Sequence, residues 1–302
     1  MYDVLCMGLT CCDLIFAELD KFPEPGKESI CKEFLIKPGG AVNTPVALTK
    51  LNLKTLYVSI IGNDYLGKKI YQYLKDTGLD MSSVITGDEY RTNTTAVLSV
   101  GRERAFASYF DEYNQEVMLE KLHQNIPNCS HVHAYVHDCL KMPVVDLVRK
   151  HNKTLSVDMS WDEKVRMDDI LPILKNCDIF MANEVEACSI TGKSNAEDAL
   201  MELACHTSIA AVKMGRNGSI VMSGGRKVHI PPVNSGLVRD TTGAGDLYAA
   251  GFIYGFLKGW DIEKTALFAS ASGGLAVTFY GGMDDGYTYE NVVQFLNKKD
   301  NR

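Results

Sequence analysis

The sequence predicts an α/β fold: a three-layer αβα domain with a mostly parallel central sheet and a small additional β-sheet. The first observation is that short β-rich runs alternate with amphipathic stretches along most of the chain, as in parallel strands joined by crossover helices. The second is that two segments, about 14–36 and 92–113, depart from this alternation. The third is that no repeat or linker divides the 302 residues, so one domain covering 1–302 is expected.

The positions of the individual elements follow from local residue patterns. Runs of β-branched, aromatic and apolar residues predict parallel strands at 4–9, 56–61, 131–135, 155–158, 179–182 and 209–213. Apolar residues at helical spacing predict helices at 43–51, 68–77, 143–151, 196–205 and 246–257. In the two exceptional segments, alternating side chains and the turn residues Pro23, Pro25, Gly26 and Gly101 favour antiparallel hairpins. These hairpins are expected to form a small β lid that covers a cleft.

Composition and charge exclude several classes of function. The 31 Lys and Arg residues against 38 Asp and Glu residues give a formal net charge of −7, which argues against nucleic-acid and anionic-membrane surfaces. No window of about 18 uncharged apolar residues occurs, so membrane insertion is not expected. The nine cysteines form no Cys-x-x-Cys pair, which favours a reducing, cytoplasmic compartment.

The most informative segment is Arg-Asp-Thr-Thr-Gly-Ala-Gly-Asp at 239–246, directly before an apolar helix. Gly243 and Gly245 allow successive backbone N–H groups to point the same way at a helix N-terminus, which forms a nest for an anion. Asp246 could simply cap the helix. However, a carboxylate beside bound anionic groups is useful when it takes a proton from the group that attacks the anion. The segment therefore favours phosphoryl transfer.

These residues resemble a known family. Residues 240–246 resemble the C-terminal motif of the ribokinase-like (PfkB) carbohydrate kinases, and Pro-Gly-Gly-Ala-Val-Asn at 38–43 resembles their N-terminal motif. The similarity also includes Ile-Gly-Asn-Asp at 61–64, Asn-Glu-Val-Glu at 183–186 and Lys-Met-Gly-Arg-Asn-Gly at 213–218, so it extends nearly from end to end. The resemblance implies a ribokinase-like fold and an ATP-dependent kinase.

The resemblance implies specific catalytic roles. Asp246 is the expected general base, which deprotonates a substrate hydroxyl as it attacks the γ-phosphate of ATP. Backbone N–H groups of Gly243, Ala244 and Gly245 are expected to hold the charge on the transferring phosphoryl group, consistent with what phosphoryl transfer requires. The position of Asp246 at a helix N-terminus predicts a low pKa.

The remaining site residues are also implied by the resemblance. The expected substrate-binding residues are Asp13, Gly39, Gly40 and Asn43. One residue fewer than usual separates the two glycines from Asn43, so Pro38 and Gly39 are an alternative pair, and Asp13 could instead be a turn residue. The expected nucleotide-binding residues are Asn183, Lys213, Gly215, Gly218 and Ser270, although dense helix packing explains Ser270 equally well.

The resemblance further implies metal ions. Glu186 is expected to help place Mg²⁺ through water, because Mg²⁺ prefers oxygen ligands and retains much of its hydration. On its own, the Asn183–Glu186 pattern would also fit an ordinary helix start. Asp240 and Thr242 match positions that hold a monovalent cation such as K⁺ in family members. A serine often found later in that site is replaced by residues near Asp285.

Three further patterns have competing interpretations. Residues 62–69 nearly match a phosphate-binding Walker A loop, but Lys69 stands where Ser or Thr must ligate Mg²⁺, so a helix-entry turn is favoured. His131, His133 and His137 could suggest a metal cluster, but core or strand-end histidines are favoured. The charged turn at 101–104 is either solvated or brings an arginine to the substrate.

The sequence is thus interpreted as an ATP-dependent kinase of a sugar or sugar-like small molecule, with ATP and Mg²⁺ as cofactors. The alternatives are a nucleoside kinase, with lid aromatics Tyr109, Phe110 and Tyr113 stacking on the base, or a catalytically inactive sugar-binding homologue. The lid has exposed edges, so a homodimer formed through it is expected.

Overall fold

The computed structural model describes residues 1–101, 103–160, 162–233, 238–281 and 284–297. The described strands form two sheets, one of nine and one of four strands. The larger sheet has the spatial order β13-β12-β11-β10-β9-β8-β1-β4-β5. Its strands are β1 (Tyr2–Met7), β4 (Thr55–Gly62), β5 (Val84–Gly87), β8 (Cys129–Tyr135), β9 (Thr154–Asp158), β10 (Ile179–Asn183), β11 (Ile209–Lys213), β12 (Ser219–Ser223) and β13 (Arg226–Ile230).

The pairing makes this sheet mostly parallel, as the sequence predicts. All neighbours from β5 to β11 pair in parallel, and β12 alone is antiparallel to its neighbours on both sides. The chain adds β4 and β5 on one side of β1 and the strands from β8 onward on the other. Such a reversal of strand order creates a crevice at the carboxyl ends of the strands, where ligands bind in open α/β sheets.

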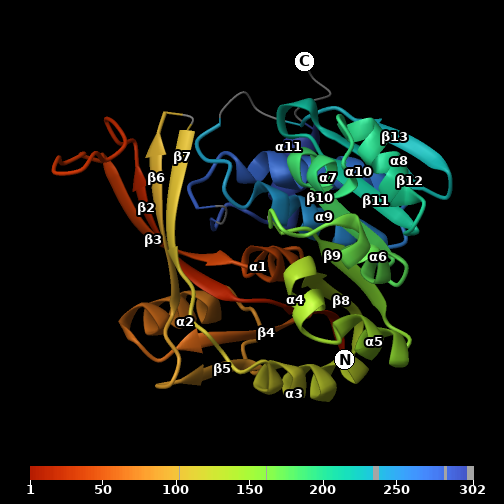
Figure 1. The fold of residues 1–302 in the computed structure, drawn as a ribbon, viewed down its shortest axis with the longest axis horizontal. Coiled ribbons are helices and arrows are strands. Elements are labelled where there is room, and N and C mark those ends of the chain that lie inside the picture. Colours follow the sequence, from red (N-terminus) through yellow and green to blue (C-terminus); the bar gives the residue numbers. More distant parts are fainter. Residues whose placement is uncertain (102, 161, 234–237, 282–283, 298–302) are drawn as a thin grey trace.

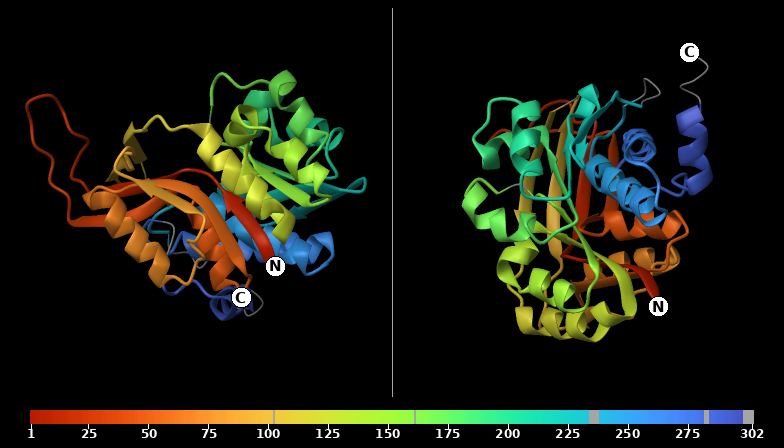
Figure 2. Two further views of the ribbon diagram at one scale, coloured as in Figure 1. Left: turned by 90° about the horizontal axis from the view of Figure 1, so that it is seen from below. Right: turned by 90° about the vertical axis from the view of Figure 1, so that its right-hand side faces the viewer.

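Helices cover both faces of the large sheet (Figures 1 and 2). One face carries α1 (Asn43–Lys50), α2 (Tyr65–Asp76), α9 (Ala244–Leu257), α10 (Ile262–Ala276) and α11 (Tyr289–Asn297). The other carries α3 (Gln115–Asn125), α4 (Val136–Lys141), α5 (Val144–Lys150), α6 (Met167–Leu174), α7 (Glu184–Thr191) and α8 (Ala196–Ala204). Side chains of β1 alternate between the two cores: Val4 and Cys6 face one, and Leu5 and Met7 face the other. The three-layer αβα fold is confirmed.

The four remaining strands form a second sheet that stands beside the first (Figure 1). Its order is β3 (Glu33–Gly40), β2 (Thr10–Ala17), β6 (Asn93–Val100) and β7 (Glu103–Tyr109). The predicted hairpins are present, but β2 and β6 pair in parallel and join them. The strands also extend beyond the predicted limits, so Asp13 and Gly39 lie inside this sheet rather than in loops.

Candidate active site

Asp246 lies in the first turn of α9, directly after the glycine-rich segment. Gly243 is the N-cap and has φ of +73°, a conformation that side chains with a Cβ atom rarely adopt. It turns the chain so that α9 begins at Ala244. The first N–H groups of a helix have no partner within the helix, so this turn can bind an anion next to the Asp246 carboxylate.

Neutral donors from two other elements fix the Asp246 carboxylate. Asn43 Nδ2, in the first turn of α1, donates to Oδ2 at 2.9 Å, and the Tyr135 hydroxyl, at the end of β8, donates to Oδ1 at 3.3 Å. The Thr44 hydroxyl donates to the backbone carbonyl of Asp246 at 3.3 Å. Residues far apart in the sequence therefore position one carboxylate at the crevice of the sheet.

The predicted low pKa of Asp246 is wrong. Burial raises its pKa to about 6, and the nearby Asp158 adds to the shift, although hydrogen bonds from Asn43 and Tyr135 and the charge of Lys213 oppose it. The helix N-terminus favours the carboxylate, but removal from water has the larger effect. The resulting pKa is close to neutral pH, which suits a general base.

Asp13 is a second carboxylate near Asp246, and its side chain is buried. Burial, together with the charges of Asp246 and Asp240, raises the pKa of Asp13 to about 7. Its side chain lies against Gly39 on the paired strand β3, where a Cβ atom would come within 2.1 Å of Asp13 Oδ2. Glycine at 39 therefore makes room for this carboxylate, and Gly40 follows at the end of β3.

Lys213 lies deep in the site at the end of β11. Its ammonium donates to both carboxylate oxygens of Asp158, at 2.8 and 2.7 Å. Burial opposes its charge, but Asp158 and Glu186 outweigh burial and raise the pKa of Lys213. A Cβ atom on Gly245 would lie 3.4 Å from Lys213 Nζ. The lysine thus places a positive charge beside the first turn of α9.

Asn183 and Glu186 form a reciprocal capping box at the start of α7. Asn183 Oδ1 accepts from Glu186 N at 2.9 Å, and Glu186 Oε2 accepts from Asn183 N at 2.8 Å. Burial raises the pKa of Glu186 to about 7, against the attraction of Lys213. The geometry shows the helix-start role, and it also holds a buried carboxylate whose charge a bound cation would stabilise.

The structure gives mixed support for the expected metal sites. Among the described residues, no group of three or more His, Cys, Asp or Glu side chains could hold a metal ion. A single carboxylate such as Glu186 still fits Mg²⁺ that is held mainly by phosphates and water. The monovalent-cation site fits poorly, because Arg104 of β7 pairs with Asp240 Oδ1 and donates to Thr242 Oγ1 at 2.8 Å. Asp285 is exposed and contacts Lys50 instead.

The remaining predicted nucleotide-binding residues lie in two places. Gly215 begins a short 3₁₀ turn after β11 and Gly218 follows that turn, and the space beside Gly215 is open. Ser270 lies within α10, where its hydroxyl is 3.4 Å from that of Ser219. Ser270 is therefore part of the packing around α10.

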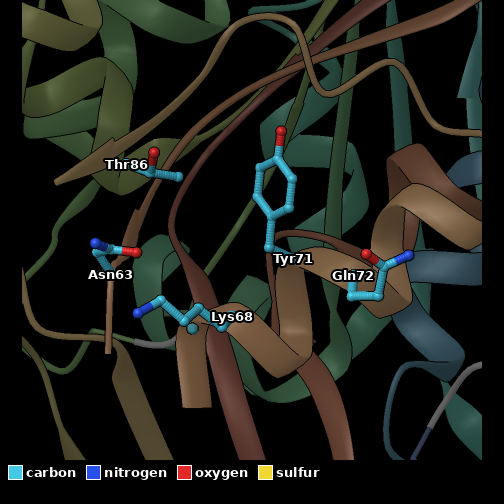
Figure 3. A pocket seen from close by; sticks show the side chains of 7 residues that line it. Asn63, Lys68, Tyr71, Gln72 and Thr86 are labelled. Atoms are coloured by element: carbon cyan, nitrogen blue, oxygen red, sulfur yellow. The ribbon is translucent and has the colours of Figure 1, made fainter. Parts of the chain in front are cut away.

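The Walker-like segment is confirmed as a helix-entry turn. Asp64 caps α2 by accepting from Gly67 N at 2.8 Å. An open hollow of about 470 Å³ lies over this turn, formed by residues of α2 with Asn63 and Thr86 (Figure 3). None of the predicted site residues lines it. The hollow is therefore separate from the candidate active site.

The structure also shows what the histidines and the charged turn contact. His131 and His133 are fully buried in β8, contact the hydroxyls of Thr154 and Ser156, and have pKa values lowered by burial to about 3. They are core histidines, as favoured. In the charged turn, Arg104 contacts the 240–242 segment, whereas Arg102 lies outside the described residues.

Four residues of the site were not predicted: Thr44, Arg104, Tyr135 and Asp158. Tyr135 and Asp158 end two predicted parallel strands, and that position alone was a usable signal. Thr44 follows the predicted Asn43. For Arg104, the sequence predicts either a solvated turn or a contact with the substrate, and no local pattern links it to Asp240.

Comparison with known proteins identifies similar chains. A nucleoside kinase from Methanocaldococcus jannaschii is 27% identical over 99% of this chain and 98% of its own length, and its crystal structure superposes with a TM-score of 0.80 at 25% identity, covering 99% of both chains. A 5-dehydro-2-deoxygluconokinase from Geobacillus thermodenitrificans is 24% identical over 97% of this chain and 93% of its own.

A third similarity concerns a structure with bound ligands. A putative ribokinase II from E. coli, solved in complex with ATP and Mg²⁺, has a TM-score of 0.83 at 20% identity, covering 99% of this chain and 100% of that chain. At this identity the likeness shows the shared fold. Within the described part of this chain, no helix is both long enough and apolar enough to cross a lipid bilayer.

The match to a family model decides the assignment. The model of the pfkB family of carbohydrate kinases matches residues 1–286, which is nearly the whole chain. The members named above are kinases of sugars or nucleosides, and such enzymes transfer a phosphoryl group to an alcohol. The chain is therefore a member of the pfkB family of carbohydrate kinases.

Proposed function

We propose that this kinase transfers the γ-phosphate of ATP to a hydroxyl group of a sugar or sugar-like alcohol, with Asp246 as the general base. The observation that carries the proposal is the half-buried Asp246 carboxylate, which is held by Asn43 and Tyr135 and adjoins the first N–H groups of α9. A binding protein has no need of a base in this position. The site therefore favours catalysis over the inactive alternative.

In the proposed reaction, each group of the site has its own role. Asp246 accepts the proton of the substrate hydroxyl as the hydroxyl oxygen bonds to the γ-phosphorus, and the bond to the bridging oxygen breaks, so that ADP leaves with the electron pair. The N–H groups at Gly243, Ala244 and Gly245 stabilise the charge on the transferring group. Lys213 adds positive charge beside Gly245. Mg²⁺, placed through water by Glu186, would neutralise charge on the phosphates.

A polyol suits the other polar groups of the crevice. Asp13 can accept hydroxyl protons. Asn43 donates to Asp246, while its Oδ1 atom is buried and has no hydrogen-bond partner among the described residues. A buried polar atom without a partner is unfavourable, and a substrate hydroxyl would satisfy it. We propose that Asp13 and Asn43 bind the sugar, and that the second sheet acts as a lid that excludes water.

A nucleoside kinase is the second candidate, because a nucleoside kinase is among the relatives. Of the aromatic residues expected to stack on a base, Phe110 is exposed, and Tyr113 packs against the second hydrophobic core. Tyr109 is exposed and donates to Asp111. These positions favour the sugar, so nucleosides serve as the competing substrates in the test.

The test is ADP release with a panel of sugars and nucleosides. Asp246→Asn should reduce kcat by about 10²-fold or more, while calorimetry with an ATP analogue should show nucleotide binding unchanged. Asp80→Asn is the matched control. Asp80 also accepts a hydrogen bond from a tyrosine, Tyr2, but lies beside the start of β1, far from the site. The turnover of this variant should be normal. Near-normal turnover of Asp246→Asn would exclude this base, and a response to nucleosides alone would establish the second candidate.

We also propose that the protein forms a homodimer through the second sheet. Its outer strands, β3 and β7, have unpaired edges among the described strands, and exposed aromatic side chains lie on the same sheet. Both features favour association with a second copy.

A further inference from the structure

Arg104 forms an unusual connection between the second sheet and the phosphate-binding segment. It lies near the start of β7, opposite Ser99 of β6, close to the turn that joins these strands. Its side chain is mostly buried and pairs with Asp240, which is also buried. Of the ion pairs between described residues, this one and Lys213–Asp158 alone have both partners less than 20% exposed. The pair is therefore more than a solvated surface contact.

The guanidinium occupies the acceptors that the family resemblance assigns to a monovalent cation. Asp240 Oδ1 accepts from Arg104 and from Thr242 N at 2.7 Å, and Oδ2 accepts from Gly281 N at 2.9 Å. The Thr242 hydroxyl accepts from Arg104 Nη1 at 2.8 Å. Each carboxylate oxygen thus already has a donor, and Oδ1 has two, which fills its lone pairs.

Electrostatics argue against a second cation in the same place. A guanidinium carries its charge at every physiological pH and its fork of N–H groups matches two neighbouring oxygens. An alkali ion bound to Asp240 or Thr242 would lie only a few ångströms from this charge, and like charges at that distance repel each other strongly in a partly buried site. The Arg104 guanidinium and an alkali cation therefore cannot both bind to Asp240 and Thr242.

We propose that Arg104 supplies, from the second sheet, the positive charge that a monovalent cation would provide beside the anion hole. This inference rests on the proposed kinase function. Arg104 acts as a positioning residue: it holds Asp240 and Thr242, and through them the turn at Gly243 that begins α9. The enzyme accordingly needs no alkali cation, and the charge reaches the site only when the hairpin β6–β7 lies against the 240–242 segment.

The experiment compares K⁺ with tetramethylammonium at equal ionic strength, because tetramethylammonium is too large to enter a dehydrated oxygen site. For the wild-type protein, the thermal midpoint without substrates and the turnover with ATP should be the same in both salts. Arg104→Met should lower the midpoint and reduce kcat by about 10²-fold in tetramethylammonium. K⁺ should restore part of both losses, since the freed oxygens can then bind it.

The controls separate this inference from a purely structural role. Arg226→Met, on β13, removes an exposed ion pair with Glu263 of α10, and this variant should show no difference between the salts. Rescue by K⁺ but not by tetramethylammonium is not expected of a variant that has only lost packing. A wild-type midpoint or turnover that rises in K⁺ overturns the proposal, as does an Arg104→Met variant that behaves alike in both salts. If the protein phosphorylates nothing in the panel, the midpoints still decide this question.

Discussion

Burial controls the chemistry of individual carboxylates in the candidate site more strongly than any local sequence feature. Asp246 illustrates this, because its place at a helix N-terminus predicts a low pKa, whereas burial raises the pKa to about 6. Asp13 is shifted further, to about 7, by burial and by the charges of Asp246 and Asp240. Such groups lower stability in exchange for reactivity or binding.

Asp13 should therefore make stability depend on pH in a defined direction. An Asp side chain titrates near 3.9 in an unfolded chain and at about 7 in the fold. Between these values the folded state retains the proton, so stability falls as pH rises from about 4 to about 7. Asp13→Asn removes this loss, and its thermal midpoint should exceed that of the wild type by about 2 °C or more at pH 8.

The comparison at acidic pH checks the explanation. At pH 4 the folded protein holds Asp13 protonated, so the advantage of Asp13→Asn should largely disappear. Glu103→Gln, which changes an exposed carboxylate on the same sheet, should leave the pH profile of the midpoint unchanged. An Asp13→Asn variant less stable than the wild type at pH 8 would show that Asp13 stabilises the fold.

At the scale of elements, Asp64 links α2 to the start of β6, a strand of the second sheet. It caps α2 through Gly67 N, and it accepts from both the backbone N–H and the hydroxyl of Thr92, each at 2.8 Å. Asp64→Ala should lower the free energy of unfolding by about 1–2 kcal/mol, measured with urea, because a helix cap is lost. Asn63→Ala loses an exposed contact with Asp88 and should change stability by less than about 0.5 kcal/mol. Equal values for both variants would contradict this role.

The elements that sequence predicted best are those whose pattern is local. Strands such as β11 are continuous apolar runs because both faces are buried, and residues 209–213 were located without error. The hairpin β12–β13 was missed, although Gly224 and Gly225 between its strands are a recognisable turn signal. Helix α3 was missed because much of its surface is polar.

In the candidate site, too, the residues of one local motif were predictable from the sequence, whereas a contact between distant segments was not. Asp246 and Gly243 stand in a contiguous motif, so sequence placed them together. The contact of Arg104 with Thr242 joins residues 138 positions apart, and it depends on how the second sheet packs. No periodicity or spacing encodes such a contact.

At the scale of the whole molecule, the second sheet contributes side chains to the site and also carries exposed aromatic groups. Asp13 and Arg104 contribute to the site. Phe106, at 61% exposure, lies two residues after Arg104 and therefore on the same face of β7, whereas Phe34, at 52% exposure, lies on the opposite face of the sheet. Figure 1 shows this sheet standing out from the body of the molecule. Because water-exposed aromatic groups beside free strand edges favour association, we expect light scattering after gel filtration to give twice the mass of one chain.

Replacement of one aromatic residue should then separate the copies. Phe106→Glu places a charge in the proposed contact, so the measured mass should fall to that of a single chain. Met201→Glu is the matched control, because Met201 is similarly exposed, at 52%, but lies on helix α8, which packs against the larger sheet. The mass of this variant should remain that of a dimer. A wild-type protein with the mass of one chain, or a dimer broken equally by both variants, would exclude association through the second sheet. Since Arg104 lies near the start of β7, the strand that also carries Phe106, a dimer would also limit the movement of β7 relative to the phosphate-binding turn.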